Sequence, residues 1–313
     1  MFLSIILIFL GCVLLSRITS YLTQNLSHLA RLLGLSSFAI TAFLLALATS
    51  LPEVSVAITA SFAGNSGLAL GSALGSNIAN FSLILGLTTL VGAPILISGD
   101  LRAHRLLPTV LLSLSPIILI LDGSLGRLDA FILLLAYALY TWETTFRHAT
   151  ISIPKKSLPK NQAKILTSLA KILILTLLLV ASAEFTVHWA KSLATILNLP
   201  PLFIGLFIVS VGTSLPELAF ELKAIRKNQT AMAFGDLIGS AVTNATLVIG
   251  LAALIRPITL TYPFPTIQAG VQYSVILILF FLFTHSKHRL DRSEGFILTA
   301  FFFYFVILEL WIN

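Results

Sequence analysis

Hydrophobic residues follow one another in long stretches along this chain, and polar residues gather between the stretches. Most stretches have about the 20 residues that a helix needs to cross the hydrocarbon core of a bilayer. Their residues do not alternate between polar and apolar, as they do in the strands of a membrane barrel. We therefore predict an all-α polytopic membrane protein. Its ten expected transmembrane helices lie near residues 2–15, 38–61, 67–97, 106–121, 130–146, 165–190, 201–222, 231–255, 267–284 and 296–312.

The composition agrees with this class of protein. Hydrophobic residues make up 57% of the chain and charged residues only 10%, whereas soluble domains carry roughly a quarter charged residues. The first hydrophobic stretch lacks the preceding cations of a signal peptide, because the first cation is Arg17. We interpret it as the first transmembrane helix, with the N-terminus outside. Cys12 is the only cysteine, so no intrachain disulfide can form.

The net charge of +7 indicates membrane topology rather than binding to nucleic acid. If ten helices alternate from an outside N-terminus, the outer loops receive only Arg127, Lys191 and Arg256. The cytoplasmic side receives most of the other cations, namely Arg17, Arg31, Arg102, Arg105, Arg147, Lys155, Lys156, Lys160, Lys164, Lys223, Arg226, Lys227, Lys287, Arg289 and Arg292. This distribution follows the positive-inside rule. It predicts a multi-pass protein of the cell membrane, surrounded by lipid and expected to be a monomer, with both termini outside.

The chain consists of two related halves. A basic segment with two prolines, residues 147–164, separates the halves at residues 1–146 and 165–313. When the first half is laid on the second, the sequence TSLPE at residues 49–53 coincides with the identical sequence at residues 213–217. This repeat alignment also lays Gly71, Gly75, Ser76, Asn80 and Gly86 on Gly235, Gly239, Ser240, Asn244 and Gly250. Because each half has an odd number of helices, we expect two inverted five-helix repeats, which in secondary transporters enclose the substrate site.

Each copy of the repeated sequence contains a proline followed by a glutamate, at Pro52–Glu53 and Pro216–Glu217. Proline has no N–H to donate to the carbonyl four residues earlier, so we expect each helix to break and to leave backbone oxygen atoms free. Free carbonyls and carboxylates are costly inside a membrane unless a partner satisfies them. A cation would be such a partner.

Further oxygen donors surround each break. The hydroxyl groups nearest the glutamates belong to Thr49, Ser50, Thr213 and Ser214. Ser76 and Asn80 are four residues apart and share one helical face, and Ser240 and Asn244 repeat this arrangement. Carboxylate, hydroxyl, amide and carbonyl oxygens are the ligands that hard cations prefer. Two carboxylates on one site can balance a divalent cation, share protons or accept several monovalent cations in exchange, which suggests an antiporter.

The motifs "ATSLPE…GSALGSNIAN" and "GTSLPE…GDLIGSAVTN" resemble those of the cation/calcium antiporter superfamily, in particular prokaryotic-type sodium/calcium exchangers. The resemblance covers nearly the whole chain. It implies a Ca²⁺ site formed by Glu53, Glu217, Thr49 and Thr213. It implies an overlapping set of Na⁺ ligands formed by Ser50, Ser76, Ser214, Ser240 and the backbone carbonyls near Ala46 and Ser210, with Asn80 and Asn244 at the central position.

Three departures from the family pattern concern the same region. Both central residues are asparagine, where prokaryotic exchangers often pair asparagine with aspartate. The first repeat has Ser72 where the family commonly has asparagine, while the second has Asp236, which could lie beside the site or cap a helix. Ser210 replaces the small apolar residue seen at Ala46 and could add a ligand or tune one.

The extra acid Glu221 lies one helical turn past Glu217. We expect it in a vestibule or at the surface rather than among the ligands.

The leading hypothesis is therefore an electrogenic Na⁺/Ca²⁺ antiporter that uses no cofactor. The alternative is an antiporter that exchanges H⁺ or another cation for Ca²⁺, because the glutamates could exchange a cation for protons. A passive cation channel is a weaker alternative, since channels also line their pores with acids and amides. The sequence contains neither the P-loop of a primary pump nor the H-E-x-x-H motif of a metalloprotease, so an enzyme is not expected.

Overall fold

The computed structural model describes residues 2–32, 49–92, 95–96, 106–146, 162–226, 230–260, 263–286 and 289–312. The first half contains α1 (Phe2–Leu32), α3 (Leu51–Phe62), α4 (Ser66–Ala79), the π-helical turn η1 (Asn80–Ile84), α5 (Leu85–Val91), β1 (Ile95–Leu96), α7 (Leu106–Leu119), the 3-10 turn η2 (Ile120–Asp122), β2 (Ser124–Leu125), α8 (Arg127–Thr141) and the π-helical turn η3 (Trp142–Phe146). Ala46 and most of the predicted linker lie outside the described residues.

The second half has a closely similar order of elements. It contains α9 (Gln162–Leu197), α10 (Pro201–Ile204), the π-helical turn η4 (Gly205–Val209), α11 (Ser210–Thr213), α12 (Leu215–Arg226), α13 (Thr230–Val242), the π-helical turn η5 (Thr243–Val248), α14 (Ile249–Ile255), β3 (Ile258–Thr259), α15 (Pro263–Ser286), β4 (Arg289–Leu290) and α16 (Arg292–Ile312). The repeat alignment carries the bounds of α3 onto those of α12, and the bounds of α5 onto those of α14. The sequence repeat is therefore also a repeat of local structure.

The expected helix breaks are present at the proline–glutamate pairs. Ser50 and Ser214 precede α3 and α12, and both have non-helical backbone angles, with φ −86° and ψ 2° at Ser50 and φ −84° and ψ 4° at Ser214. The helix then resumes with proline at its second residue, where a missing N–H is tolerated because the first N–H groups of a helix have no intrahelical acceptor. The prediction of a break at this motif is confirmed in the second half, where α11 ends at Thr213 and α12 begins at Leu215.

The structure contains six helical segments that are long and apolar enough to cross a membrane, among the residues it describes, and two shorter apolar helices. It thus supports a multi-pass membrane protein, while the count of ten spans stays a prediction. Two spans are longer than expected, because α1 has 31 residues and α9 has 36. Neither contains a proline, so their isolated polar residues do not interrupt the helix. The α9 helix ends at Leu197, just before Asn198, whose positive φ of 54° stops further helical hydrogen bonding.

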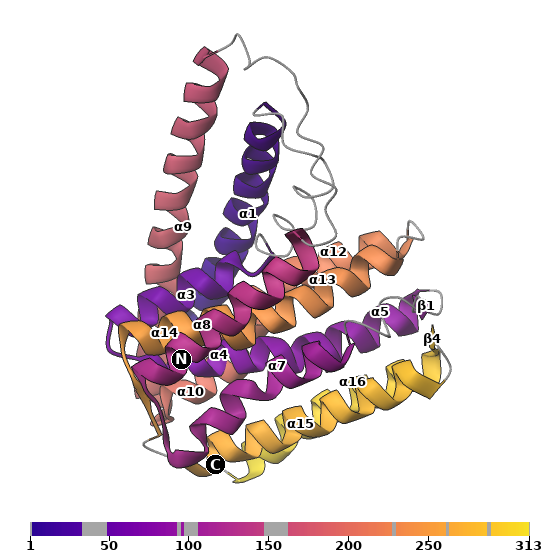
Figure 1. Ribbon diagram of the computed structural model, residues 1–313. Coiled ribbons are helices and arrows are strands. Elements are labelled where there is room, and N and C mark those ends of the chain that lie inside the picture. Colours follow the sequence, from indigo (N-terminus) through magenta and orange to yellow (C-terminus); the bar gives the residue numbers. More distant parts are fainter. Residues whose placement is uncertain are drawn as a thin grey trace.

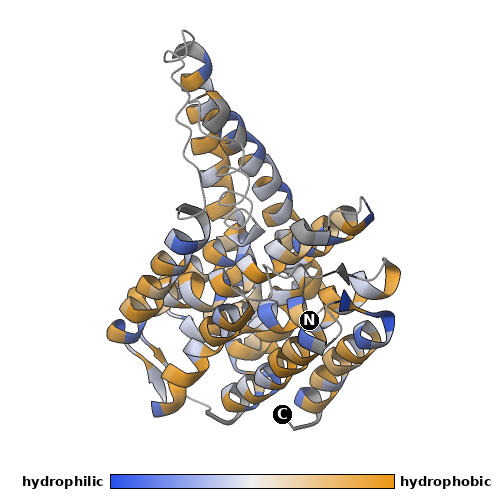
Figure 2. Ribbon diagram, turned by 45° about the vertical axis from the view of Figure 1, so that its right-hand side comes forward, coloured by the Kyte–Doolittle hydropathy of each residue, from blue (hydrophilic) through white to orange (hydrophobic). Residues whose placement is uncertain are grey.

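The helices form one packed body from which α1 and α9 extend side by side (Figure 1). The two long helices approach closely where Gly11 faces the hydroxyl of Thr186. Within the body, α4 and α13 are largely buried and carry the small and polar residues of the repeat. The outer faces are hydrophobic (Figure 2), with large exposed side chains such as Phe131 on α8 and Phe303 on α16. A surface of this kind suits contact with lipid.

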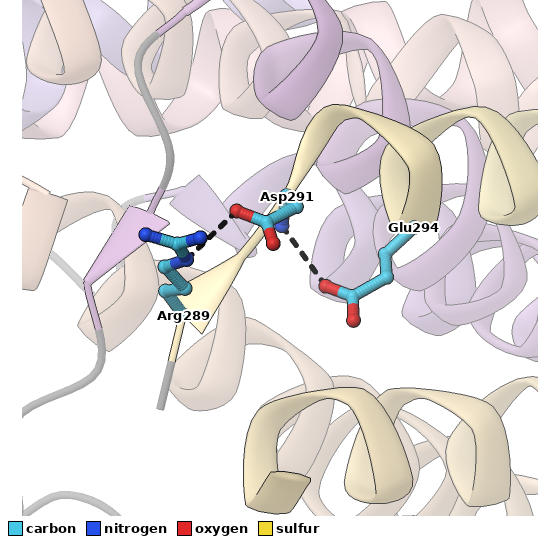
Figure 3. Close-up of polar contacts among 3 residues, drawn as sticks. All are labelled: Arg289, Asp291 and Glu294. Carbon is cyan, nitrogen blue, oxygen red and sulfur yellow. Dashed lines mark hydrogen bonds and ion pairs between the residues drawn. The ribbon is translucent and has the colours of Figure 1, made fainter. Parts of the chain in front are cut away.

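Two short antiparallel strand pairs connect the halves. Ile95 of β1 lies opposite Leu290 of β4, and Leu125 of β2 lies opposite Ile258 of β3. After β4, the Asp291 carboxylate forms an ion pair of 2.9 Å with Arg289, and the Asp291 N–H donates to the Glu294 carboxylate at 2.9 Å (Figure 3). A glutamate that accepts from the backbone three residues earlier defines the start of a helix. These contacts fix the turn between α15 and α16.

Candidate functional site

The two glutamates of the repeated motif lie in the first turns of α3 and α12. Both are fully inside the protein, with exposures of 0% for Glu53 and 1% for Glu217. One carboxylate oxygen of Glu53 and both of Glu217 have no hydrogen-bond partner among the described residues. Buried carboxylates are costly in this condition. They are therefore placed to receive a positively charged group.

Close backbone contact brings the helices of the two halves together around the glutamates. A Cβ at Gly71 would collide with the Leu202 carbonyl of α10, and a Cβ at Gly75 would collide with the Leu206 carbonyl of η4. Gly205 in turn lies against the backbone of α4. The glycines of the repeat thus allow α4 to lie directly on the broken helix of the second half, as small residues do in membrane proteins.

One group of oxygen atoms, which we call the Thr213 cluster, consists of Ser76, Ser210 and Thr213. The Ser76 hydroxyl donates to Glu53 Oε1 at 3.2 Å and lies 3.4 Å from Thr213 Oγ1. The Thr213 hydroxyl donates to the Ser210 backbone carbonyl at 3.2 Å. The Ser210 side chain donates to the Leu206 carbonyl, so Ser210 contributes its backbone oxygen to the cluster.

A second group, which we call the Thr49 cluster, consists of Thr49, Ser240 and Asp236. The Thr49 hydroxyl lies 3.0 Å from Ser240 Oγ and donates to Asp236 Oδ1 at 3.2 Å. Under the repeat alignment, the Thr49–Ser240 contact becomes the Thr213–Ser76 contact. The two clusters therefore have matching hydroxyl pairs, each formed by one residue from either half.

The central asparagines occupy π-helical turns at matching positions, Asn80 in η1 and Asn244 in η5. Asn244 Nδ2 donates to Asn77 Oδ1 at 3.1 Å, and Asn77 Nδ2 donates to the Ala241 carbonyl at 3.0 Å. Asn77 and Ala241 are themselves matching positions of the repeat. Ala241 has no side-chain amide, so it offers Asn80 no counterpart of the Asn77 oxygen that accepts from Asn244. Both polar atoms of the Asn80 side chain are without a partner in the described part of the chain.

The structure thus brings together most of the predicted site residues. The hydroxyls of Ser50 and Ser214 are also buried close to the breaks, but neither has a hydrogen-bond partner among the described residues, and the predicted Ala46 carbonyl lies outside them. Asn77 also takes part in this arrangement but is not among the predicted ligands. Its role depends on a distant partner in the other half, Ala241, so only the repeat alignment could have indicated it.

The structure also gives clear positions for the two additional acidic residues, Asp236 and Glu221. Asp236 lies inside α13 and contacts Thr49, so it belongs beside the site and does not cap a helix. Glu221 is only 2% exposed, so the expectation of a surface position was wrong. Glu217 lies close to Glu53, Asp236 and Glu221. Three of these four acidic residues belong to the second half.

The chemical character of the site is that of a binding site for hard cations. No group of three or more His, Cys, Asp or Glu side chains has metal-binding geometry within the described ranges. The two clusters and the asparagines instead combine carboxylate, hydroxyl, amide and carbonyl oxygens, which together form the ligand type of Na⁺ and Ca²⁺ sites.

Comparisons with known proteins agree with this geometry. The family model for "Sodium/calcium exchanger protein" matches residues 3–146 and 167–311. An uncharacterized membrane protein of Methanocaldococcus jannaschii is 30% identical over 294 residues, covering 94% of this chain and 93% of that protein. The sodium/calcium exchanger MaX1 of Methanosarcina acetivorans is 26% identical, with 98% of each chain covered. A structure of the sodium-calcium exchanger NCX_Mj matches with a TM-score of 0.66 and 26% identity, covering 98% of this chain and 99% of that one.

Proposed function

Because this chain belongs to the sodium/calcium exchanger family, we propose that it exchanges Na⁺ for Ca²⁺ across the cell membrane by alternating access. The family and fold are those of a multi-pass membrane transporter, not of an enzyme, and they make the chain a cation/Ca²⁺ antiporter. The finer proposal is that Na⁺ is the coupled ion.

The observation that carries the proposal is the arrangement of Glu53 and Glu217. Each follows a helix break, and both are buried with at least one oxygen that has no partner among the described residues. Glu53 also accepts from Ser76, whose hydroxyl forms one of the two pairs that join the halves. Two carboxylates balance the charge of one Ca²⁺. The same negative charge can be balanced by monovalent cations distributed over neighbouring oxygens, so one site can hold either ion in turn.

We assign the Ca²⁺ ligands to Glu53, Glu217, Thr49 and Thr213, because their oxygens come from both breaks. Na⁺ ions would bind at the two clusters, with Ser76 and Ser210 as ligands in the Thr213 cluster and Ser240 as a ligand in the Thr49 cluster. The family resemblance implies the Ala46 carbonyl as a further Na⁺ ligand, and Ser50 and Ser214 are proposed ligands beside the breaks. Asn80 would face the centre, since its amide oxygen has no protein partner in the described ranges.

The proposed topology is two inverted five-helix repeats with both termini outside. It is supported by the matching bounds of the repeated helices and by the way the strands pair: β1 pairs with β4 and β2 with β3, so each pair joins the two halves. It is also supported by the small number of cations in the predicted outer loops. One chain contributes both halves of the site, so we propose that a monomer in lipid is sufficient for transport.

The proposal can be tested by measuring uptake of radioactive Ca²⁺ into proteoliposomes that contain the purified protein and are loaded with Na⁺. A pH gradient is imposed in a separate experiment. We expect an outward Na⁺ gradient to drive Ca²⁺ uptake and a pH gradient to have no effect. Glu53→Gln and Glu217→Gln should each reduce uptake to the level of empty liposomes, because either change removes a charge that balances Ca²⁺.

A matched control is Glu184→Gln, which removes a carboxylate from an exposed position on α9 and should keep full transport. Uptake driven by the pH gradient alone would replace the proposal with H⁺/Ca²⁺ exchange. Uptake that requires no ion on the opposite side would indicate a channel. Full transport by Glu53→Gln would show that the site has been assigned to the wrong residues.

A further inference from the structure

The two oxygen clusters are alike in their hydroxyls but differ at one matching position beside them. The repeat alignment exchanges Thr49 with Thr213 and Ser240 with Ser76. It also places Asp236 of the Thr49 cluster on Ser72. Asp236 is 3% exposed and Ser72 is 1% exposed, so both positions are interior. A carboxylate is thus built into one end of the site, and the matching position at the other end has only a hydroxyl.

Asp236 determines how the hydroxyl protons of its cluster are arranged. An ionised carboxylate can only accept hydrogen bonds, and a hydroxyl has one proton to donate. Since the Thr49 proton is directed to Asp236 Oδ1, the 3.0 Å contact between Thr49 and Ser240 requires Ser240 to be the donor. The oxygen of Ser240 then offers only lone pairs to a cation. In the Thr213 cluster, the Thr213 proton is directed to a neutral backbone carbonyl and the Ser76 proton to Glu53 Oε1, so the carboxylate in contact there is one of the two repeat glutamates.

The second carboxylate oxygen of Asp236 is also available to a cation. Asp236 Oδ2 is buried and has no hydrogen-bond partner among the described residues. The two glutamates already balance one Ca²⁺, so the charge of Asp236 exceeds what Ca²⁺ requires. A further monovalent cation at the Thr49 cluster would balance it, and a charged ligand oxygen binds such a cation more strongly than a neutral one.

We propose that Asp236 is a specificity-determining residue that makes the Thr49 cluster a stronger site for a monovalent cation than the Thr213 cluster. This inference rests on the proposed exchange of Na⁺ for Ca²⁺. In this proposal Asp236 increases the affinity for Na⁺ more than it increases the affinity for Ca²⁺. It also predicts that the two ends of the site have different affinities although their hydroxyl pairs match.

The test is equilibrium binding of radioactive Ca²⁺ to the purified full chain in detergent, with displacement by increasing Na⁺. The variant Asp236→Asn keeps an oxygen that accepts from Thr49 and removes only the charge. We expect it to raise the Na⁺ concentration for half-displacement by roughly tenfold, the loss of one charge-assisted contact. Its affinity for Ca²⁺ should change much less. Asp236→Glu keeps the charge and should therefore lose less Na⁺ affinity than Asp236→Asn. If Asp236 had only a structural role, the charge would not matter and Asp236→Glu would not bind Na⁺ better than Asp236→Asn.

Two further variants complete the design. Ser72→Asp places a carboxylate at the matching position and should lower the Na⁺ concentration for half-displacement, which tests the proposal even if Asp236→Asn does not fold. Glu184→Gln, on the exposed face of α9, should leave both affinities unchanged. Equal changes in Na⁺ and Ca²⁺ affinity in Asp236→Asn, or no change in either Asp236→Asn or Ser72→Asp, would overturn the proposal. Wild-type protein from which Na⁺ does not displace Ca²⁺ would instead show that the proposed sodium coupling is wrong.

Discussion

The close contact between α4 and α10 leads to a prediction in which the chain contains its own control. Gly71 and Gly235 are matching residues of the repeat, and each is the sixth residue of its helix. A Cβ at Gly71 would meet the Leu202 carbonyl oxygen and would lie 3.0 Å from the carbonyl carbon, where ordinary contacts begin at 3.4 Å. A Cβ at Gly235 would have no described atom within 4 Å. We therefore predict that Gly71→Ala is destabilising and that Gly235→Ala is not.

The magnitude follows from two opposing effects. Alanine is favoured over glycine inside a helix by about 1 kcal/mol, and this gain is the same for both variants. Only Gly71→Ala adds an overpacking cost of about 1–3 kcal/mol, because backbone cannot move aside as a side chain can. The difference between the variants should therefore be about 1–3 kcal/mol. The midpoint of thermal unfolding of Gly71→Ala should lie roughly 2–8 °C below that of Gly235→Ala.

The measurement is thermal unfolding of both variants in the same detergent, followed by tryptophan fluorescence. Ca²⁺ transport in proteoliposomes should fall with Gly71→Ala, because α4 also carries Ser76, whose hydroxyl contacts Glu53 at 3.2 Å. Gly235→Ala should transport normally. Equal midpoints for the two variants would refute the reasoning, since the contact of α4 with α10 would then have no energetic consequence.

Two further predictions concern hydrogen bonds outside the two clusters. Asn77→Ala should lower stability by about 2 kcal/mol in thermal or denaturant unfolding, because it leaves the Asn244 amide and the Ala241 carbonyl buried without their partner; an unchanged midpoint would contradict this. Glu294→Gln should lower the free energy of unfolding by about 0.5–1 kcal/mol, because it weakens the start of α16. Arg289→Ala should have the smaller effect, less than about 1 kcal/mol, because the Arg289 side chain is 53% exposed in its ion pair. A larger loss for Arg289→Ala than for Glu294→Gln would contradict this order.

The local features of the site could be predicted from the sequence because each depends on neighbouring residues. Proline at residue 216 has no N–H to donate to the carbonyl of Gly212, which favours the break found at Ser214. The four-residue spacing of Ser240 and Asn244 likewise fixes their common face. The repeat alignment extended these local predictions to both halves.

The remaining features depend on contacts between distant residues. The sequence left open whether Asp236 lies beside the site or caps a helix, because its partner Thr49 is 187 residues away. Glu221 was expected in a vestibule or at the surface, and its burial results from packing around α12 that its sequence position does not reveal. The lengths of α1 and α9 were underestimated because polar residues do not by themselves end a helix; α9 continues to Leu197, just before the positive φ of Asn198.

The side chains that differ between the halves have a further consequence if the repeats are inverted. Two identical inverted halves would give the inward-facing and outward-facing states the same internal energy, because the repeat symmetry exchanges one state with the other. Any preference must then come from differences between the copies, or from lipid and ions. The polar differences inside the protein include Asp236, which corresponds to Ser72, Glu221, which corresponds to Ala57, and Asn77, which corresponds to Ala241. Asp236 and Glu221 add a buried carboxylate to the second half only, so under the proposed alternating access ion binding would change the energies of the two states unequally. The common backbone would then let either side open, and these buried differences would determine which state an ion favours.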